Sequence, residues 1–276
     1  MAVTQADVKK AAQALGIQPG DTVLIHSSFK SLGPVEGGAA SVIGGFLDAV
    51  GPEGNLVFPT LCQQDFGHAY ENWYMDAPSD VGYLTNYFRK LPGALRSDQA
   101  THSVAAMGKD AHYLTCTHGQ TGQRYGVYGD TPFSADSPWE KMYKMGAKMV
   151  CLGVGLRKCT FRHYAEYCFV EKCLAKAEGS PEYDRLKAQL KYFGRTEPDG
   201  IWPHIENEYV QIFMEAAGQV QHAQCGDAEL LLVNVADFLK QAWELMDKLD
   251  PQVYRTKLDT PERAILWKWL ETIQSL

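Results

Sequence analysis

Residues 156–170, LRKCTFRHYAEYCFV, place a histidine and a glutamate three positions apart. If a helix begins at Thr160, His163 and Glu166 lie on the same face of that helix. A histidine beside a carboxylate has the arrangement of a general base, because the carboxylate fixes the tautomer and stabilises the imidazolium that forms. The same spacing also occurs in surface ion pairs that contribute little to stability. Spacing alone therefore leaves both interpretations open.

A second candidate is the stretch of residues 26–41, HSSFKSLGPVEGGAAS, which follows the apolar run Thr22–Ile25 and leads into a helical pattern. A strand that ends in a loop of small residues and opens a helix is a common receptor for phosphate. The loop is neither a Walker A motif nor a GxGxxG fingerprint, so it indicates an anionic ligand without naming one. Glycine required by turn geometry alone is the alternative explanation.

Two further histidines and a group of acids complete the set of candidates. His26 begins the glycine loop, and His102 immediately precedes a strand-like run, although each alone is compatible with a hydrogen-bonded structural histidine. Asp76 lies in residues 61–79 and Asp80 directly after them, and both help to make this connection acidic, which fits either a solvated loop or contacts for substrate amines. Neither an HExxH motif nor a clustered acidic triad occurs, so no metal is expected. The absence of a GxSxG elbow weakens a serine-hydrolase interpretation.

Composition limits the class of protein. The chain has 276 residues, 45% hydrophobic and 21% charged, with a formal net charge of −7. These values fit a globular protein with a real core and argue against nucleic-acid binding, which needs a basic surface. An acidic protein mildly favours a polycationic ligand. No signal-peptide pattern or membrane-length apolar run occurs, and the seven cysteines are scattered without a CxxC pair, so a cytoplasmic location is expected.

The elements that must position these residues alternate in type. Four segments have the pattern of strands: 22–25, 55–59, 103–107 and 148–154. Five segments have the pattern of helices: 3–15, 39–50, 80–90, 138–144 and 161–173. This order predicts an α/β fold with a central mixed sheet flanked by helices. Ligands of such folds bind at the carboxyl ends of the strands, where the glycine loop begins.

The connections and the C-terminal third are less regular. Residues 61–79 and 112–136 form long connections, which are often functional. Residues 174–209 are expected to be helical with a hairpin-like turn at Pro198–Gly200, and residues 228–276 largely helical. We therefore expect one domain over 1–276, with a smaller helical and hairpin excursion on the substrate side at about 174–225.

Taken together, five segments resemble the aminoglycoside 3-N-acetyltransferase family, also called the antibiotic N-acetyltransferase family. They occur in the family's order from about residue 5 to residue 245, and they read HSSFKSLGPVEGGAASVIGGFLDAVGPEGNLVFPT, DVGYLTNYFRKLPGALRS, THSVAAMG, GDTPFSADSPWEKM and LGVGLRKCTFRHYAEY. The combination is specific, although each segment alone would be weak.

The resemblance implies transfer of an acetyl group from acetyl-CoA to the 3-amino group of a 2-deoxystreptamine aminoglycoside, and hence antibiotic resistance. It implies that His163 is the base and Glu166 its partner, with no acyl-enzyme and no metal. Coenzyme A would lie along the following residues: His26, Ser27, Ser28, Lys30, Val35, Gly37, Gly38, Ser103 and Val104. The polycationic substrate would contact His102, Asp76 and Asp80. Neither nucleic acid nor membrane is an expected partner, and a homodimer is left open.

One departure from the family pattern bears on the acceptor. Many members carry a His-Pro pair shortly after the Arg-Ser of this region, whereas this chain has Gln99-Ala100 after Arg96–Asp98. Transfer by a family member to another amine, such as an amino sugar or a biosynthetic intermediate, is therefore the alternative function. A non-catalytic binding protein on the same scaffold is a third hypothesis, which the His163–Glu166 pair disfavours.

Overall fold

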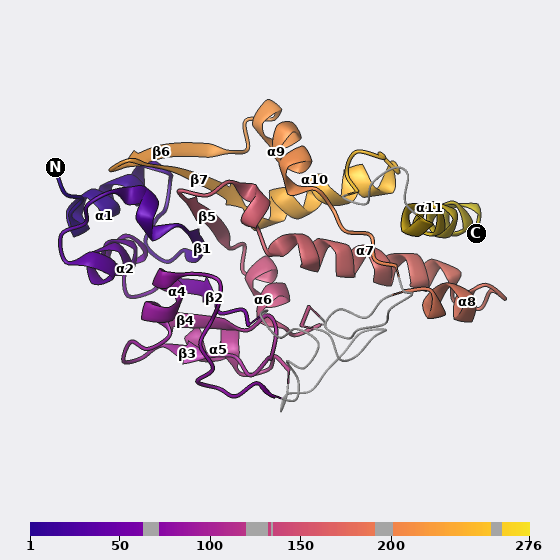
Figure 1. Ribbon diagram of the computed structural model, residues 1–276, viewed down its shortest axis with the longest axis horizontal. Coiled ribbons are helices and arrows are strands. Elements are labelled where there is room, and N and C mark those ends of the chain that lie inside the picture. Colours follow the sequence, from indigo (N-terminus) through magenta and orange to yellow (C-terminus); the bar gives the residue numbers. More distant parts are fainter. Residues whose placement is uncertain (63–71, 120–131, 134, 191–200, 255–260) are drawn as a thin grey trace.

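A computed structural model describes residues 1–62, 72–119, 132–133, 135–190, 201–254 and 261–276. Its centre is a seven-stranded sheet in the order β3-β4-β2-β1-β5-β7-β6 (Figure 1). The strands are β1 (Thr22–Ser27), β2 (Asn55–Pro59), β3 (Leu95–Arg96), β4 (Val104–Gly108), β5 (Lys148–Leu152), β6 (Gln221–Cys225) and β7 (Ala228–Asn234). β1 pairs in parallel with β2 and β5, and the outer pairings are antiparallel. The predicted mixed α/β sheet is confirmed.

The sheet separates two apolar cores because successive side chains of a strand point to opposite faces. On β1, Val23 and Ile25 belong to one core and Leu24 to the other. The first core packs under α1 (Gln5–Ala14), α2 (Gly38–Val50) and α4 (Tyr83–Phe88). The second packs under α5 (Ala111–Thr115), α6 (Pro138–Lys144), α7 (Phe161–Ala177), α8 (Tyr183–Ala188), α9 (Asn207–Ala216), α10 (Val235–Asp247) and α11 (Pro261–Ser275).

Most predicted elements occur within a few residues of their expected bounds. The first helix begins where the sequence predicts, because Thr4 and Asp7 form a reciprocal capping box with the helix backbone. The helix that contains His163 is longer than expected and ends at Ala177. It packs beside α10 (Figure 1). None of the described helices is long and apolar enough to cross a membrane.

One expectation about elements is wrong in part. Residues 228–276 do contain the helices α10 and α11, but Ala228–Asn234 form β7, which pairs with β6 as a hairpin at the edge of the sheet. The apolar run Leu230–Val233 is buried on both faces in this strand, which removes the alternation that would identify it. The predicted turn at Pro198–Gly200 lies outside the described residues, as do 63–71, 120–131 and 134 within the two long connections.

The parallel strands β1 and β5 bring the two candidate segments together. His26 is in register with Cys151 and Ser27 with Leu152, so both strands end at the same edge of the sheet. The chain then continues into the 3-10 helices η1 (Phe29–Leu32) and η3 (Leu156–Lys158). At this edge Gly153 has a φ of 60°, and an added Cβ would lie 1.6 Å from Ser31 Oγ. Glycine is therefore required where the two segments cross.

Candidate active site

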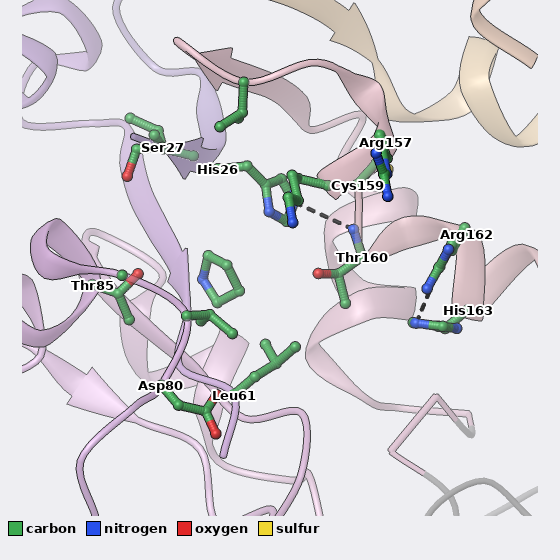
Figure 2. A pocket seen from close by; sticks show the side chains of 16 residues that line it. His26, Ser27, Leu61, Asp80, Thr85, Arg157, Cys159, Thr160, Arg162 and His163 are labelled. Atoms are coloured by element: carbon green, nitrogen blue, oxygen red, sulfur yellow. Dashed lines mark hydrogen bonds between the residues drawn. The ribbon is translucent and has the colours of Figure 1, made fainter. Parts of the chain in front are cut away.

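A cavity of about 560 Å³ opens at this edge of the sheet. Figure 2 shows residues of the η3–α7 segment, among them Arg157, Thr160 and His163, on one side of it and Asp80 and Leu61 on the other. The full lining is Ile25, His26, Ser27, Pro59, Leu61, Asp80, Val81, Gly82, Thr85, Val154, Arg157, Lys158, Cys159, Thr160, Arg162 and His163. Its position agrees with the expectation that ligands bind beyond the strand ends.

The His163–Glu166 pair forms inside the protein rather than on its surface. His163 Nδ1 lies 2.9 Å from Glu166 Oε2, and the two residues are 7% and 0% exposed. Burial distinguishes this pair from a solvated ion pair of the same spacing, because water does not screen the interaction. The pair therefore has the geometry of a base and its orienting carboxylate.

Glu166 has partners that the sequence did not indicate. Its Oε2 accepts hydrogen bonds from Trp202 Nε1 at 3.0 Å and from His204 Nδ1 at 3.3 Å, in addition to His163. Its Oε1 accepts one from the backbone N–H of Ile205 at 2.9 Å. The segment 202–205 thus provides three of the four donors that hold a fully buried carboxylate. No motif marks this segment, because its role depends on its folding against α7.

These contacts determine the charges of the pair. Burial alone would raise the pKa of Glu166, but the neighbouring His163 and His204 outweigh it and lower that pKa, so Glu166 is ionised. Burial is the main cause that lowers the pKa of His163 to about 4; Glu166 opposes this shift, and Arg162 and His204 contribute to it. His163 is therefore neutral near pH 7, which is the form that accepts a proton.

The tautomer of His163 follows from its two neighbours. An ionised carboxylate only accepts hydrogen bonds, so Nδ1 carries the proton that is shared with Glu166. Nε2 then carries no proton, and its lone pair accepts a hydrogen bond of 3.3 Å from Arg162 Nε (Figure 2). The basic nitrogen of His163 therefore faces the cavity side of α7 together with a guanidinium group.

His26 supports the helix that carries this base. Its Nε2 accepts a 3.4 Å hydrogen bond from the backbone N–H of Thr160, and burial lowers the pKa of His26 to about 4. Thr160 occupies the N-cap position of α7, as expected, but its side chain makes no capping hydrogen bond. A neutral histidine from β1 thus satisfies one of the amides at the start of α7.

His102 lies behind the base, not on the cavity wall. It is fully buried, and its ring centroid lies 5.5 Å from that of His163. Gln99 Oε1 accepts hydrogen bonds from the backbone N–H groups of Thr101 and His102 at 2.9 and 2.5 Å. Gln99, which departs from the family's His-Pro pair, therefore holds the turn that places His102. Burial, followed by His163, His118 and Arg162, lowers the pKa of His102 well below its usual value.

The other predicted site residues divide into two groups. Ser27 and Asp80 line the cavity together with His26 and His163. Eight are not part of its lining: Ser28, Lys30, Val35, Gly37, Gly38, Ser103, Val104 and Asp76. Ser103 and Val104 are fully buried at the start of β4, and Gly37 and Gly38 have φ values of 72° and 62°, which a tight turn requires. Contact of these eight residues with coenzyme A or substrate stays a prediction.

His163, Glu166 and His204 also place three potential metal-ligating atoms within 4.8 Å of one another, as a metal site would. Glu166 Oε2 already accepts three hydrogen bonds, and both histidines use Nδ1 to make two of them. A bound metal would have to displace those protons. The cluster is therefore better suited to holding protons than to binding a metal ion.

Known proteins resemble the chain in sequence and in structure. A model of the family described as aminoglycoside 3-N-acetyltransferase matches residues 24–247. An aminoglycoside N(3)-acetyltransferase III from a Salmonella species is 32% identical over 180 residues, which span 59% of this chain and 60% of the relative, less than two thirds of its length. A second such Salmonella protein is 28% identical over 254 residues, 80% of this chain and 85% of the relative.

The structure of AAC-IIIb in a binary complex with CoASH has the same fold. Its TM-score is 0.68 at 20% identity, and the alignment covers 93% of this chain and 100% of the other. The family match extends over most of the chain and includes β1, β5 and the His163–Glu166 pair. The chain therefore belongs to the aminoglycoside 3-N-acetyltransferase family of acyltransferases.

Proposed function

We propose that this protein transfers an acetyl group from acetyl-CoA directly to an amine, with His163 as general base. The observation that carries the proposal is the buried pair, in which Glu166 holds the Nδ1 proton of a neutral His163, so that Nε2 is the nitrogen that can take up a second proton. General-base catalysis of this kind contributes roughly 10²–10⁴-fold to a rate. The CoASH complex of the related AAC-IIIb supports acetyl-CoA as the donor.

In the proposed reaction, the acetyl group passes directly from coenzyme A to the amine without a covalent enzyme intermediate. The amine nitrogen bonds to the thioester carbonyl carbon, and its proton passes to His163 Nε2. The carbon–sulfur bond then breaks, and the coenzyme A thiolate leaves and takes up a proton. Glu166 stabilises the imidazolium formed on the way, as a carboxylate beside a catalytic histidine does. Burial raises the pKa of Cys159, the cysteine on the cavity wall, to about 12, so this residue is a thiol and not a nucleophile.

The acceptor proposed first is the 3-amino group of a 2-deoxystreptamine aminoglycoside, as the names of the relatives suggest. Asp80 supports it, because its carboxylate is on the cavity wall opposite α7 (Figure 2). Acetylation of another amine is the second candidate, and the cations on the η3–α7 side of the cavity favour it, since Arg157, Lys158 and Arg162 would repel a polycation. Residues 174–225 as a substrate-side excursion, a homodimer and a cytoplasmic location stay predictions.

Release of coenzyme A thiol from acetyl-CoA, measured with a panel of amines, tests the reaction. Aminoglycosides and their derivatives blocked at the 3-amine belong in the panel beside amino sugars. Release with an aminoglycoside that stops when the 3-amine is blocked would establish the first acceptor. Release with amino sugars alone would establish the second, and binding of amines without release would revive the non-catalytic hypothesis.

The base is tested by His163→Ala. We expect kcat to fall by about 10²–10⁴-fold while the dissociation constant of coenzyme A changes little, because only the proton acceptor is removed. Stopped-flow thiol release and calorimetric titration with coenzyme A provide the two numbers. A variant that keeps a near-normal kcat would show that His163 is not the base.

A further inference from the structure

Three cationic side chains lie together on one wall of the cavity, and we call them the basic wall: Arg157, Lys158 and Arg162. Arg157 and Lys158 belong to η3 and are exposed, and Arg162 is half-buried in the first turn of α7. Among the described residues of the lining, Asp80 is the one acid, and it lies on the opposite side (Figure 2). The cavity of this acidic protein is therefore locally basic.

Arg162 brings the basic wall to the reacting end of the cavity. Arg162 Nε is 3.3 Å from His163 Nε2, the atom that must receive the proton of the acceptor amine. The thioester carbon must also come to this point. The phosphates of coenzyme A are separated from its sulfur by the whole pantetheine arm. Groups close to Arg162 therefore belong to the acceptor rather than to the phosphates of the donor.

Proton transfer to His163 adds a positive charge beside the basic wall. When His163 takes up a proton, an imidazolium forms beside the Arg162 guanidinium, and two like charges in contact disfavour each other. A polycationic acceptor would add further positive charge at the same point. An acidic group on the acceptor would instead accept hydrogen bonds from the guanidinium and offset the charge that develops on His163. Arginine suits this role because its planar fork matches carboxylate and phosphate oxygens.

We propose that the natural acceptor is a small amine that also carries an acidic group, a carboxylate or a phosphate, and that the basic wall binds this group beside His163. The inference rests on the proposed acetyl transfer and deepens its second candidate, acetylation of another amine, by naming the class of that acceptor. Asp80, on the opposite wall, is placed to contact the ammonium form of the same molecule before it loses its proton.

Binding to the protein saturated with coenzyme A tests this assignment separately from catalysis, because the donor's own phosphates are then in place. The probes share one scaffold: glucosamine, a phosphate ester of glucosamine, and muramic acid, which carries a carboxylate. Kanamycin serves as the polycation. We expect calorimetry to show at least one acidic probe binding about tenfold or more tightly than glucosamine. Equal affinity, no binding of either acidic probe, or tightest binding of kanamycin would overturn the inference.

Two substitutions test whether the basic wall causes the preference for the acidic probe. Arg157→Gln and Lys158→Gln should each lower the preference for the acidic probe over glucosamine, by about threefold to tenfold. Lys172→Gln is the matched control, since it removes the same charge from an exposed position of α7 outside this cavity. If instead the two variants weaken coenzyme A itself and leave the preference unchanged, the basic wall serves the donor and the inference fails.

The same probes in the thiol-release assay separate this inference from the proposed function. Acetylation of the acidic probe with a higher kcat/KM than glucosamine would support both. Acetylation that is best with glucosamine or kanamycin would leave acetyl transfer standing and overturn the acidic acceptor. Binding of the acidic probe to the coenzyme A complex without any thiol release would instead leave the basic wall standing and count against acetyl transfer.

Discussion

Glu166 combines full burial with a negative charge, a combination that is costly unless every oxygen is hydrogen-bonded. Four donors meet this demand: His163, Trp202, His204 and the backbone N–H of Ile205. The carboxylate therefore does more than orient His163. It also ties the segment 202–205 to α7, so the base and the second histidine share one fixed anion.

Glu166→Gln should reduce both activity and stability. The amide keeps the shape but loses the charge that stabilises the imidazolium, and its NH₂ group would face one of the existing donors. We expect kcat to fall by at least about 10²-fold and the free energy of unfolding to fall by about 1–3 kcal/mol. Steady-state kinetics and urea unfolding measure the two effects.

Glu178→Gln is the matched control, because Glu178 is an exposed glutamate at the end of α7. It should change both quantities little, since surface substitutions away from special features usually stay within about 0.5 kcal/mol. A normal kcat in the Glu166 variant would show that the buried charge is structural and takes no part in proton transfer.

At the scale of elements, the site depends on how closely the ends of β1 and β5 approach. The segment after β5 passes over the segment after β1 at Gly153, where the left-handed backbone and the contact with Ser31 both exclude a side chain. His26, the second-last residue of β1, also accepts a hydrogen bond from the first turn of α7. Two strands and one helix are thus joined within a few residues of the base.

Gly153→Ala should therefore cost more than backbone strain alone. Gly146 offers the comparison, because its φ of 66° is close to the 60° of Gly153 and nothing lies within 4 Å of its added Cβ. We expect Gly146→Ala to lower the free energy of unfolding by about 1–2 kcal/mol from the left-handed conformation. Gly153→Ala should cost at least about 1 kcal/mol more from overpacking. Equal losses in urea unfolding would show that the crossing at Ser31 is loosely packed.

At the scale of the whole molecule, the charges of the site couple its chemistry to folding. His26, His102 and His163 are all buried, and burial lowers the pKa of each from the ordinary 6.5, to about 4 for His26 and His163. At pH values between the folded and the unfolded pKa, these histidines bind protons in the unfolded chain but not in the folded protein. The linkage relation then requires stability to decrease as pH falls through this range.

The free energy of unfolding should thus fall between about pH 6.5 and pH 4, with a slope of about 1.4 kcal/mol per pH unit for each histidine that is neutral only when folded. His222 acts in the opposite sense and at higher pH, because its bonds to Glu229 and Glu215 raise its pKa above 6.5, so the stability it contributes is lost as pH rises above that value. Urea unfolding at several pH values measures the slope. His26→Gln should reduce this slope by the contribution of about one histidine. A free energy of unfolding that does not change with pH in the unsubstituted protein would contradict the assignment of neutral buried histidines.

The sequence correctly indicated the parts of the fold with strong local signals. The helical pattern of 3–15 corresponds to α1, and the apolar runs of β1, β2 and β5 mark buried strands. The β6–β7 hairpin was missed, because Leu230–Val233 are buried on both faces and an unbroken apolar run does not distinguish strand from helix. His204 was missed because nothing in its neighbourhood along the chain marks it as a partner of Glu166.

By itself, the sequence determined the α/β class, the order of the elements, the family resemblance and the presence of a histidine and a glutamate on one helical face. All of these depend on residue types at short separations, where helix and strand periodicity act directly. The tertiary structure decided that the pair is buried, that His163 is neutral, that His26 supports α7 and that three cations line the cavity of the base. These properties depend on desolvation and on contacts between segments far apart in the chain, which no local pattern records.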